Sequence, residues 1–334
     1  MVDLRDSAVV PILSAVSIGR IPHAQLQDAV AEAMADSDPA NLFMRLFYLF
    51  QRIGLFELAN DMHAKALERR RVFRLEGPAN PRIRLLAIMG PDPERDNSPV
   101  EYLIENSDIR LELYYPDFSQ AMPDELPDHD IALVAIGESE AVNGHLRHLE
   151  MLIGDWPRPV LNRPASILHC ARDKIALLLA DVKGLVVPLN RRMNRHAMES
   201  VAFPMVIRPM DAHAGKGFEK IDDDEALRHY LATHEQDEFY GADYIDYRSA
   251  DGQFRKYRIA LINHEPHLCH LAITDHWMVH YITAGMEVSA DKQAEEAQAF
   301  LSFHQGFCHR HREALANIAR LLCLLYTSPS PRDS

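Results

Sequence analysis

The sequence predicts an α/β (α+β) protein in which an N-terminal helical segment precedes a small parallel α/β domain and a larger domain of two α+β lobes. Two observations carry this prediction. Apolar residues recur at helical spacing over residues 1–76. From Ile83 onward, short β-branched and apolar runs alternate with helical stretches, a rhythm typical of βαβ units. A chain of 334 residues is long enough for two or three such domains.

Residues 1–78 are expected to be helical, with no convincing strand among them. Helical spacing covers three stretches, Ala24–Ala35, Pro39–Ile53 and Phe56–Arg74. Asp38 is a suitable N-cap because Pro39 follows it at the first helical position. Gly54 then separates two helices that look like one tetratricopeptide-type hairpin. Two interpretations stay open, a plain helical cap and a true repeat through which residues 1–78 bind a protein partner.

A Gly/Pro-rich linker at residues 77–81 opens the predicted α/β domain, residues 82–165. The expected strands are Ile83–Met89, Ile109–Tyr115, Asp130–Ile136 and Arg158–Asn162, with helical stretches near Pro99–Ile104 and Val142–Ile153. Gly90 and Gly137 lie at strand ends, where open parallel sheets receive ligands. No G-x-G-x-x-G follows the first strand, which disfavours a dinucleotide site.

Residues 166–322 form the predicted third domain. It is expected to contain a helix at Ile167–Val182, a hairpin of Phe254–Ile262 and His267–Thr274 with a turn at Asn263–Pro266, and a long polar helix at Ala290–Leu322. Residues 323–334 are expected to be an artefactual tail, because the Ser/Pro-rich run resembles a translated sequencing adaptor and suits neither a helix nor a central strand. A natural disordered tail is the alternative.

Composition limits the possible partners. Lys and Arg number 35 against 49 Asp and Glu, a formal charge of −14, so the surface repels nucleic-acid backbones at long range. No run of about 18 uncharged apolar residues predicts a membrane span. The basic leader of a signal peptide is missing, and the four cysteines form no C-x-x-C pair. We therefore expect a cytoplasmic protein with reduced thiols that partners neither nucleic acid nor membrane.

The strongest local signal is the run Phe203–Pro209 followed by His213–Ile221. An apolar strand delivers Arg208 at its end, and a loop follows in which Gly215 and Gly217 flank Lys216. Glycines let backbone N–H groups approach phosphate oxygens closely, and the two cations supply charge. Each such charge-assisted hydrogen bond contributes roughly 1.5–3 kcal/mol. An ordinary hairpin with a basic tip explains the loop alone equally well.

The wider order of segments resembles the ATP-grasp superfamily, nearest its glutathione-synthetase-like and ribosomal-protein-glutamate-ligase-like branch. The resemblance covers residues from about 83 to 322 and rests on order and spacing. It implies an ATP-grasp fold with ATP between two lobes. The matching segments are Asp173–Lys174, Phe203–Ile221, Glu238–Tyr247 and Phe254–Ile262.

Candidate nucleotide-binding residues follow from this resemblance. Lys174 matches the helix-opening lysine directed at ATP phosphates, and Arg208 stands where the family usually has lysine. His213, Gly215, Lys216 and Gly217 match the lid over the triphosphate. Asp243, Tyr244 and Ile245 match the hinge whose backbone usually reads the adenine edge, where glutamate is commoner than this aspartate.

Arg258 and Arg255 are the catalytic candidates. Arg258 matches the arginine of a D-x-R strand that faces the transferred phosphate, and Lys256 replaces the acidic partner. The resemblance implies that a small-molecule or peptide carboxylate attacks the γ-phosphate of ATP to give an acyl phosphate. An amine or thiol acceptor then displaces phosphate. Such sites work by positioning and charge neutralisation, with Mg²⁺ as cofactor.

One departure from the family pattern concerns the metal ligands. The family places an Asp, a Glu and an Asn on strands after the last long helix, but here that helix runs directly into the adaptor-like tail. We therefore expect a truncated and inactive copy of a ligase that is active at full length, with no metal ligands in the chain. The alternative is a non-catalytic nucleotide-binding scaffold that docks partners through its N-terminal helices.

Five histidines between His264 and His280 suggest a metal site as a further hypothesis. His276 and His280 are spaced i, i+4, which would suit a zinc pair on a helix. His267 and His270 would point to opposite faces of a strand, and no H-E-x-x-H is present. Ordinary packing or surface histidines are the favoured interpretation, and a substrate role for Asp275–His276 stays open.

Overall fold

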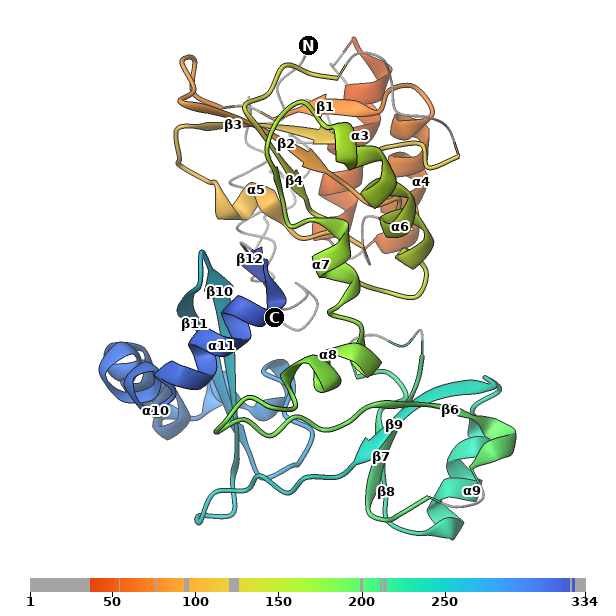
Figure 1. Cartoon of the computed structure of the whole chain (residues 1–334), viewed down its shortest axis with the longest axis vertical. Coiled ribbons are helices and arrows are strands. Elements are labelled where there is room, and N and C mark those ends of the chain that lie inside the picture. Colours follow the sequence, from red (N-terminus) through yellow and green to blue (C-terminus); the bar gives the residue numbers. More distant parts are fainter. Residues whose placement is uncertain are drawn as a thin grey trace. The chain divides into compact units, whose positions relative to one another are not determined.

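The computed structural model describes residues 37–53, 55–75, 77–92, 96–119, 126–198, 201–210, 212, 215–324 and 326–327. The described chain forms two compact units (Figure 1). Unit 1 contains the described residues up to 137 together with 145–164, and unit 2 contains residues 138–144 and those from 165 onward. The expected helix Ala24–Ala35 lies outside the described residues.

Unit 1 is a five-stranded sheet with helices. Its helices are α3 (Pro39–Arg52), α4 (Phe56–Leu67), α5 (Val100–Leu103) and α6 (Asn143–Leu152), followed by the 3₁₀ turn η1 (Ile153–Asp155). Its strands are β1 (Val72–Arg74), β2 (Ile83–Ile88), β3 (Ile109–Tyr114), β4 (Ile131–Val134) and β5 (Val160–Leu161), in the order β1-β3-β2-β4-β5. Strands β3, β2, β4 and β5 are parallel, as the βαβ rhythm predicts. The predicted α/β fold class is confirmed.

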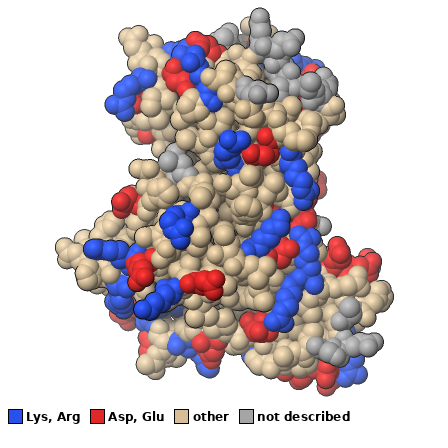
Figure 2. Space-filling view, in the orientation of Figure 1, with Lys and Arg blue, Asp and Glu red and all other residues tan. Residues whose placement is uncertain are grey.

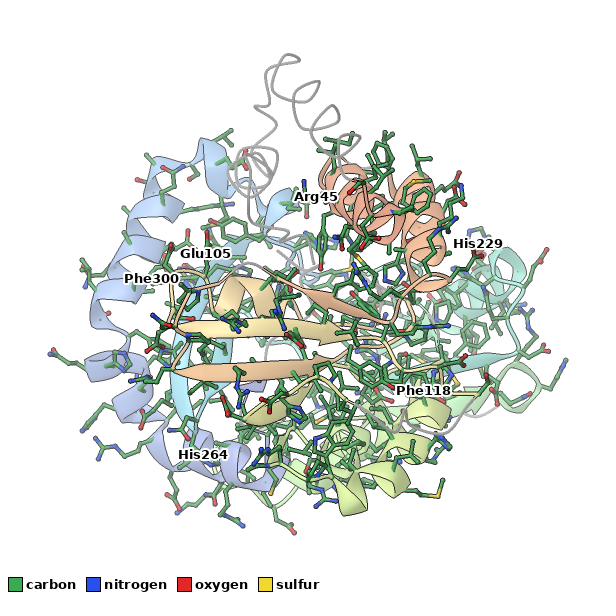
Figure 3. The ribbon with its side chains drawn as sticks, turned by 90° about the horizontal axis from the view of Figure 1, so that it is seen from above. Arg45, Glu105, Phe118, His229, His264 and Phe300 are labelled. Carbon is green, nitrogen blue, oxygen red and sulfur yellow. The ribbon has the colours of Figure 1, made fainter. Side chains whose placement is uncertain are left out.

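The helical segment and the sheet of unit 1 share one core. Met44 and Phe47 of α3 and Ala59 of α4 pack in the same apolar cluster as Leu85 and Leu111 of the sheet. Figure 3 shows the strands with α3 and α4 on one side, where Arg45 is labelled, and α6 on the other. The Asp38 side chain accepts from the Ala40 N–H at 2.9 Å, so the predicted N-cap of α3 is confirmed.

One prediction for this segment is wrong, because a strand does occur before residue 77. The helix predicted over Phe56–Arg74 ends at Leu67, and Val72–Arg74 form β1, antiparallel to β3. Phe73 points into the core with 1% exposure, and Arg74 pairs with Glu112 on β3. The short run Val72–Phe73 between two arginines fits a strand as well as a helix, and pairing with β3 decides between them.

Unit 2 contains two antiparallel sheets. A four-stranded sheet, β6-β9-β7-β8, is made of β6 (Arg191–Asn194), β7 (Met205–Pro209), β8 (Glu219–Ile221) and β9 (Glu238–Asp243), and α9 (Asp224–Thr233) packs on it. A three-stranded sheet, β11-β10-β12, is made of β10 (Phe254–Ile262), β11 (Glu265–Thr274) and β12 (Tyr326–Thr327). The remaining elements are α7 (Pro164–Leu168), α8 (Arg172–Leu179), η2 (Arg195–Ala197), η3 (Ile282–Ala284), η4 (Met286–Val288), α10 (Ala290–Ser302), η5 (His304–Cys308) and α11 (Arg312–Leu322).

Two helices predicted as continuous are interrupted. The helix expected at Ile167–Val182 is split into α7 and α8, with His169 and Cys170 between them. The helix expected at Ala290–Leu322 consists of α10 and α11 separated by the π-helical segment η5. Gly306 lies inside that segment, and a single π turn is a usual form of local helix distortion. Periodicity alone does not register such breaks, because apolar spacing continues across them.

The β10–β11 hairpin has a shorter turn than expected. Only Asn263 and His264 connect the strands, both with positive φ (49° and 67°), as in the two-residue turns that suit the twist of a hairpin. His264 is labelled at this turn in Figure 3. At the other side of β10, Tyr326 and Thr327 pair with Ile262 and Leu261 as a two-residue edge strand. These two residues of the predicted artefactual tail thus have regular structure.

None of the helices described combines the length and the apolar character that crossing a membrane requires.

Candidate active site

One face of the sheet β6-β9-β7-β8 carries a row of cations. Directly paired residues in antiparallel strands point to the same face. The register pairs Arg192 of β6 with Tyr240 of β9, and Tyr240 with Arg208 of β7. The Arg192 guanidinium lies over the Tyr240 ring, 5.7 Å from its centroid. This row therefore places two arginines on either side of a tyrosine.

A second, more apolar row lies beside the first. Val206 of β7 pairs with Ala242 of β9 on one side and with Lys220 of β8 on the other. Small and branched apolar side chains lie at the centre of this row, and Lys220 adds a cation at its edge. The Lys220 Nζ lies 4.7 Å from the centroid of the Tyr244 ring, where a cation–π contact is favourable.

Between β7 and β8, residues 210–218 form the lid loop. Asp211, His213 and Ala214 lie outside the described residues, so the structure does not place His213. Gly215 and Gly217 have φ of 73° and 64°, the left-handed region that glycine adopts without strain. A Cβ on Gly217 would lie 2.9 Å from Pro209 Cδ, and the Tyr230 hydroxyl donates to the Gly217 carbonyl at 2.7 Å. The base of the lid loop is thus fixed, and Lys216 beyond it is exposed.

Arg208 contacts the lid loop that follows it. Its guanidinium lies 5.8 Å from the Phe218 ring centroid, and its Nη2 donates to the Ala212 carbonyl. The prediction that a strand delivers Arg208 beside the glycine-rich loop is therefore confirmed in its geometry.

The predicted hinge directly follows the same sheet. Asp243 is the last residue of β9 and Tyr244 and Ile245 continue from it. The Tyr244 N–H donates to the Pro204 carbonyl at 3.1 Å, so this N–H is not the group that would read an adenine edge. Trp277 packs edge-on against Tyr244 and Phe218, with ring centroids at 6.0 and 5.3 Å. These aromatic contacts join the hinge, the end of the lid loop and the segment after β11.

The two candidate arginines of β10 have different surroundings. Arg258 is buried, with 7% exposure, and pairs across the strands with His270. Arg255 bonds Asp251 through Nη1 at 3.1 Å and Nη2 at 2.7 Å, and Glu295 through Nε at 2.6 Å and Nη2 at 3.0 Å. These bonds hold Arg255 against α10, on the strand face opposite to Arg258. The structure therefore gives Arg255 a structural environment.

Lys174 lies in the first turn of α8, as predicted, and is exposed. Its neighbour Asp173 accepts from Arg192 Nε at 2.8 Å, which ties the start of α8 to the cation row. Burial acts to raise the pKa of Asp173, but the hydrogen bond and the charge of Arg192, together with smaller contributions, outweigh it and the pKa is lowered. Figure 2 shows basic and acidic side chains next to one another over unit 2.

A cavity of about 630 Å³ lies where β7 ends and β9 begins. Its lining includes Glu140, Arg192, Lys216, Gly217, His234 and Glu238. Arg192 of the cation row and Lys216 and Gly217 of the lid loop therefore line one space, together with the carboxylates Glu140, Asp237 and Glu238. Arg192 and Lys216 are the groups there that could bind an anion, and His234 lies beside Gly217.

The histidine hypothesis for a metal has no support in the described part of the chain. No group of three or more His, Cys, Asp or Glu side chains there is arranged to hold an ion. His276 and His280 are not on one helix, since regular structure resumes only at η3. His270 instead stacks on Tyr281 at 4.7 Å.

Comparison with known proteins gives structural similarity only. No family model matches the chain, and no curated protein matches it. A RimK domain ATP-grasp protein from Sphaerobacter thermophilus is 15% identical, covering 71% of this chain and 99% of that one, with a TM-score of 0.36. VanG D-Ala:D-Ser ligase from Enterococcus faecalis is 16% identical, covering 73% and 83%, with a TM-score of 0.41. The ATP-grasp ligase PsnB, complexed with a minimal precursor, is 11% identical, covering 73% and 83%, also at 0.41.

The chain is thus similar to ATP-grasp ligases, the family that its sequence resembles. All three TM-scores lie below 0.5, so the function below rests on the residues of the chain itself.

The structure brings together part of the predicted site and adds residues to it. Arg208, Gly215, Lys216 and Gly217 meet at one end of the sheet face, and the hinge follows the neighbouring strand. Sequence reasoning missed three side chains of this face, Arg192, Tyr240 and Lys220. Strand alternation counted from Arg208 would have found Lys220 and Tyr240 only with the register known.

Proposed function

We propose that this chain binds ATP on the sheet face of Val206, Arg208 and Ala242 and is an ATP-dependent carboxylate–amine or carboxylate–thiol ligase. One observation carries the proposal, the alignment of a cation row and an apolar row on one face that ends at a glycine-rich loop. The adenine would lie over Val206 and Ala242 beside the hinge, and the phosphates would extend toward Arg208 and the lid loop.

The reaction class proposed here is the one that the resemblance to ATP-grasp ligases implies, and the cations of the site are consistent with it. A carboxylate oxygen of the substrate attacks the γ-phosphorus, the bond to the β-phosphate oxygen breaks, and an acyl phosphate and ADP result. The amine or thiol of a second substrate then attacks the acyl carbon, and inorganic phosphate leaves. Neither step needs a protein nucleophile, because positioning and neutralisation of the phosphate charge lower the barrier.

The chain's own cations have separate roles in this proposal. Arg208 and Lys216 hold the phosphates under the lid loop, Lys174 approaches them from the first turn of α8, and Arg258 faces the phosphoryl group in transfer. Arg255 orders the β10–α10 packing and takes no part in the chemistry. Mg²⁺ in such reactions neutralises phosphate charge, and among the described residues no group of three or more His, Cys, Asp or Glu side chains is arranged to hold an ion.

The test is nucleotide binding followed by turnover. ADP and ATP should protect the lid loop from limited proteolysis, and Arg208→Ala should remove the protection. Arg228→Ala, on the outer surface of α9, is the matched control and should keep it. ADP release that depends on an added carboxylate and amine or thiol would establish the ligase. Protection without any turnover would instead favour the nucleotide-binding scaffold, and no protection would exclude both.

A further inference from the structure

Glu140 is bound in the way that proteins bind a ligand carboxylate. Its Oε1 accepts from Arg192 Nη2 at 2.5 Å, and its Oε2 accepts from Arg192 Nη1 at 3.3 Å. The Tyr240 hydroxyl also donates to Glu140 Oε1 at 2.9 Å. Both terminal nitrogens of one guanidinium thus meet both oxygens of one carboxylate, the fork arrangement by which arginine recognises carboxylates and phosphates.

The two donors are held in place without Glu140. Asp173 accepts from Arg192 Nε at 2.8 Å, so the side edge of the guanidinium is fixed and its two terminal nitrogens point outward. The guanidinium also lies over the Tyr240 ring. Tyr240 lies in the paired strand β9 and is 3% exposed, and its burial, the largest cause, raises the pKa of its hydroxyl, which keeps the hydroxyl a donor. The arrangement is therefore preorganised for an oxyanion.

The position of Glu140 allows a ligand anion to displace it from Arg192 and Tyr240. It lies in residues 137–142, a stretch without helix or strand, whereas Arg192 and Tyr240 lie in paired strands. The Arg192 side chain is 43% exposed and that of Glu140 is 27% exposed, and both line the cavity that contains Lys216 and Gly217 of the lid loop. A partly exposed ion pair contributes little to stability, so an incoming anion loses little by replacing Glu140.

We propose that Arg192 and Tyr240 form a receptor for an oxyanion of the ligand, a carboxylate or a phosphate, and that Glu140 is an internal competitor for it. The proposal rests on the proposed function in one respect, that the ligand anion belongs to ATP or to the carboxylate substrate. The receptor lies in the same row as Arg208, and an anion bound there would share the cavity with Lys216 and Gly217. Glu140 then acts as an autoinhibitory side chain.

The experiment compares the affinity of the whole chain for inorganic phosphate, glutarate and ADP by calorimetry, in wild type and Glu140→Gln. The substitution keeps the size of the side chain and removes the competing charge, so binding of the anion that the receptor takes should tighten by about two- to tenfold. Glu150→Gln is the matched control, since Glu150 also bonds an exposed arginine, Arg163, at 3.0 Å. It should leave all three affinities unchanged.

Two further variants make the result specific. Adding Tyr240→Phe or Arg192→Gln to Glu140→Gln should reverse the gain, and Tyr240→Phe does so with the smallest disturbance of the sheet. A gain for phosphate and ADP alone identifies the nucleotide as the source of the anion, and a gain for glutarate alone identifies the carboxylate substrate. Equal affinities in wild type and Glu140→Gln for all three probes would overturn the receptor. A gain for phosphate or glutarate without any ADP binding would support the receptor and contradict the proposed nucleotide site.

Discussion

The two faces of the sheet β6-β9-β7-β8 come from alternate residues of the same strands, yet their chemistry is opposite. Toward α9, Met205 and Ile207 are almost fully buried with Leu227 and Tyr230. On the other face, the residue between them, Val206, and the residue after them, Arg208, belong to the two rows of the candidate site. One five-residue strand therefore packs against α9 with one face and carries residues of the candidate site on the other.

This difference separates stability from binding along a single strand. Substitutions on the α9 face should change the free energy of unfolding and leave ligand affinity nearly unchanged in the folded protein. Substitutions on the other face should do the reverse. Measurements on variants of the two faces can contradict this separation of stability from binding or show how complete it is.

The largest effect is expected at Ile207. It is 0% exposed, so Ile207→Ala removes buried apolar atoms and leaves a cavity, lowering the free energy of unfolding by about 2–5 kcal/mol. Val206→Ala, one residue earlier on the other face, is the matched control and should lose clearly less. Urea unfolding of both variants measures the difference. Equal losses would show that the two faces are not distinct.

A smaller effect is expected at Arg208, in affinity and not in stability. Arg208→Ala removes the cation at the lid loop, and the loss of about 1.5–3 kcal/mol of charge-assisted binding weakens ADP roughly 10- to 150-fold. Arg208→Lys keeps the charge and should recover part of the affinity. Calorimetry with ADP, together with a melting temperature for each variant, separates binding from folding. A wild-type affinity for ADP in Arg208→Ala would show that the phosphates bind elsewhere.

Sequence reasoning anticipated the elements of this sheet better than its function. The apolar run before Arg208 and the glycines after it predicted a strand and a loop because both signals are local. The positions of Arg192 and Tyr240 beside Arg208 depend on which strands pair and in which register, since β6 precedes β7 along the chain but pairs with β9, and β9 comes after β8. Long-range pairing of this kind is not contained in periodicity.

The same limit explains the predictions that failed. Val72–Arg74 became a strand only because β3 offered an edge for it, and η5 interrupts a helix whose apolar spacing runs on unchanged. Arg255 is not one of these failed predictions, but its partners show the same limit, because the carboxylates Asp251 and Glu295 lie 4 and 40 residues away along the chain. The role of a cation on a strand depends on which face it occupies and on which carboxylates lie there. The sequence alone does not give these neighbours.

An intermediate loss of stability is expected for alanine at the two glycines of the lid loop, one of which contacts residues of the α9 side. Gly217 rests on Pro209 and bonds Tyr230, which belongs to the α9 side, whereas Gly215 in the same loop would place a Cβ 3.7 Å from Met278 Sδ, an ordinary contact. Both have positive φ, so Ala at either position costs about 1–2 kcal/mol of backbone strain. Gly217→Ala should lose more, because its Cβ also overlaps Pro209. Thermal unfolding of Gly215→Ala and Gly217→Ala checks this. An equal loss of stability in the two variants would mean that Pro209 moves aside without cost.

The smallest change in the free energy of unfolding is expected for Asp173→Asn. Unlike the effect of a substitution on the α9 face, this change depends on pH. Burial is the largest single effect and acts to raise the pKa of Asp173 in the folded protein, but the hydrogen bond and the charge of Arg192, with smaller contributions from a backbone N–H and Lys174, together lower it. A carboxyl group with a depressed folded pKa stabilises the protein above its unfolded pKa of about 3.9, and this contribution disappears as the pH falls through the folded pKa. Asp173→Asn should therefore lose up to about 1 kcal/mol of unfolding free energy at pH 7 and approach the wild-type value in acid.

Ile207→Val on the α9 face is the control. It involves no titrating group, so its loss of unfolding free energy should be the same at every pH. Unfolding free energies of both variants between pH 7 and pH 2.5 measure the two slopes, and parallel curves would show that the Asp173–Arg192 pair does not stabilise the charged face.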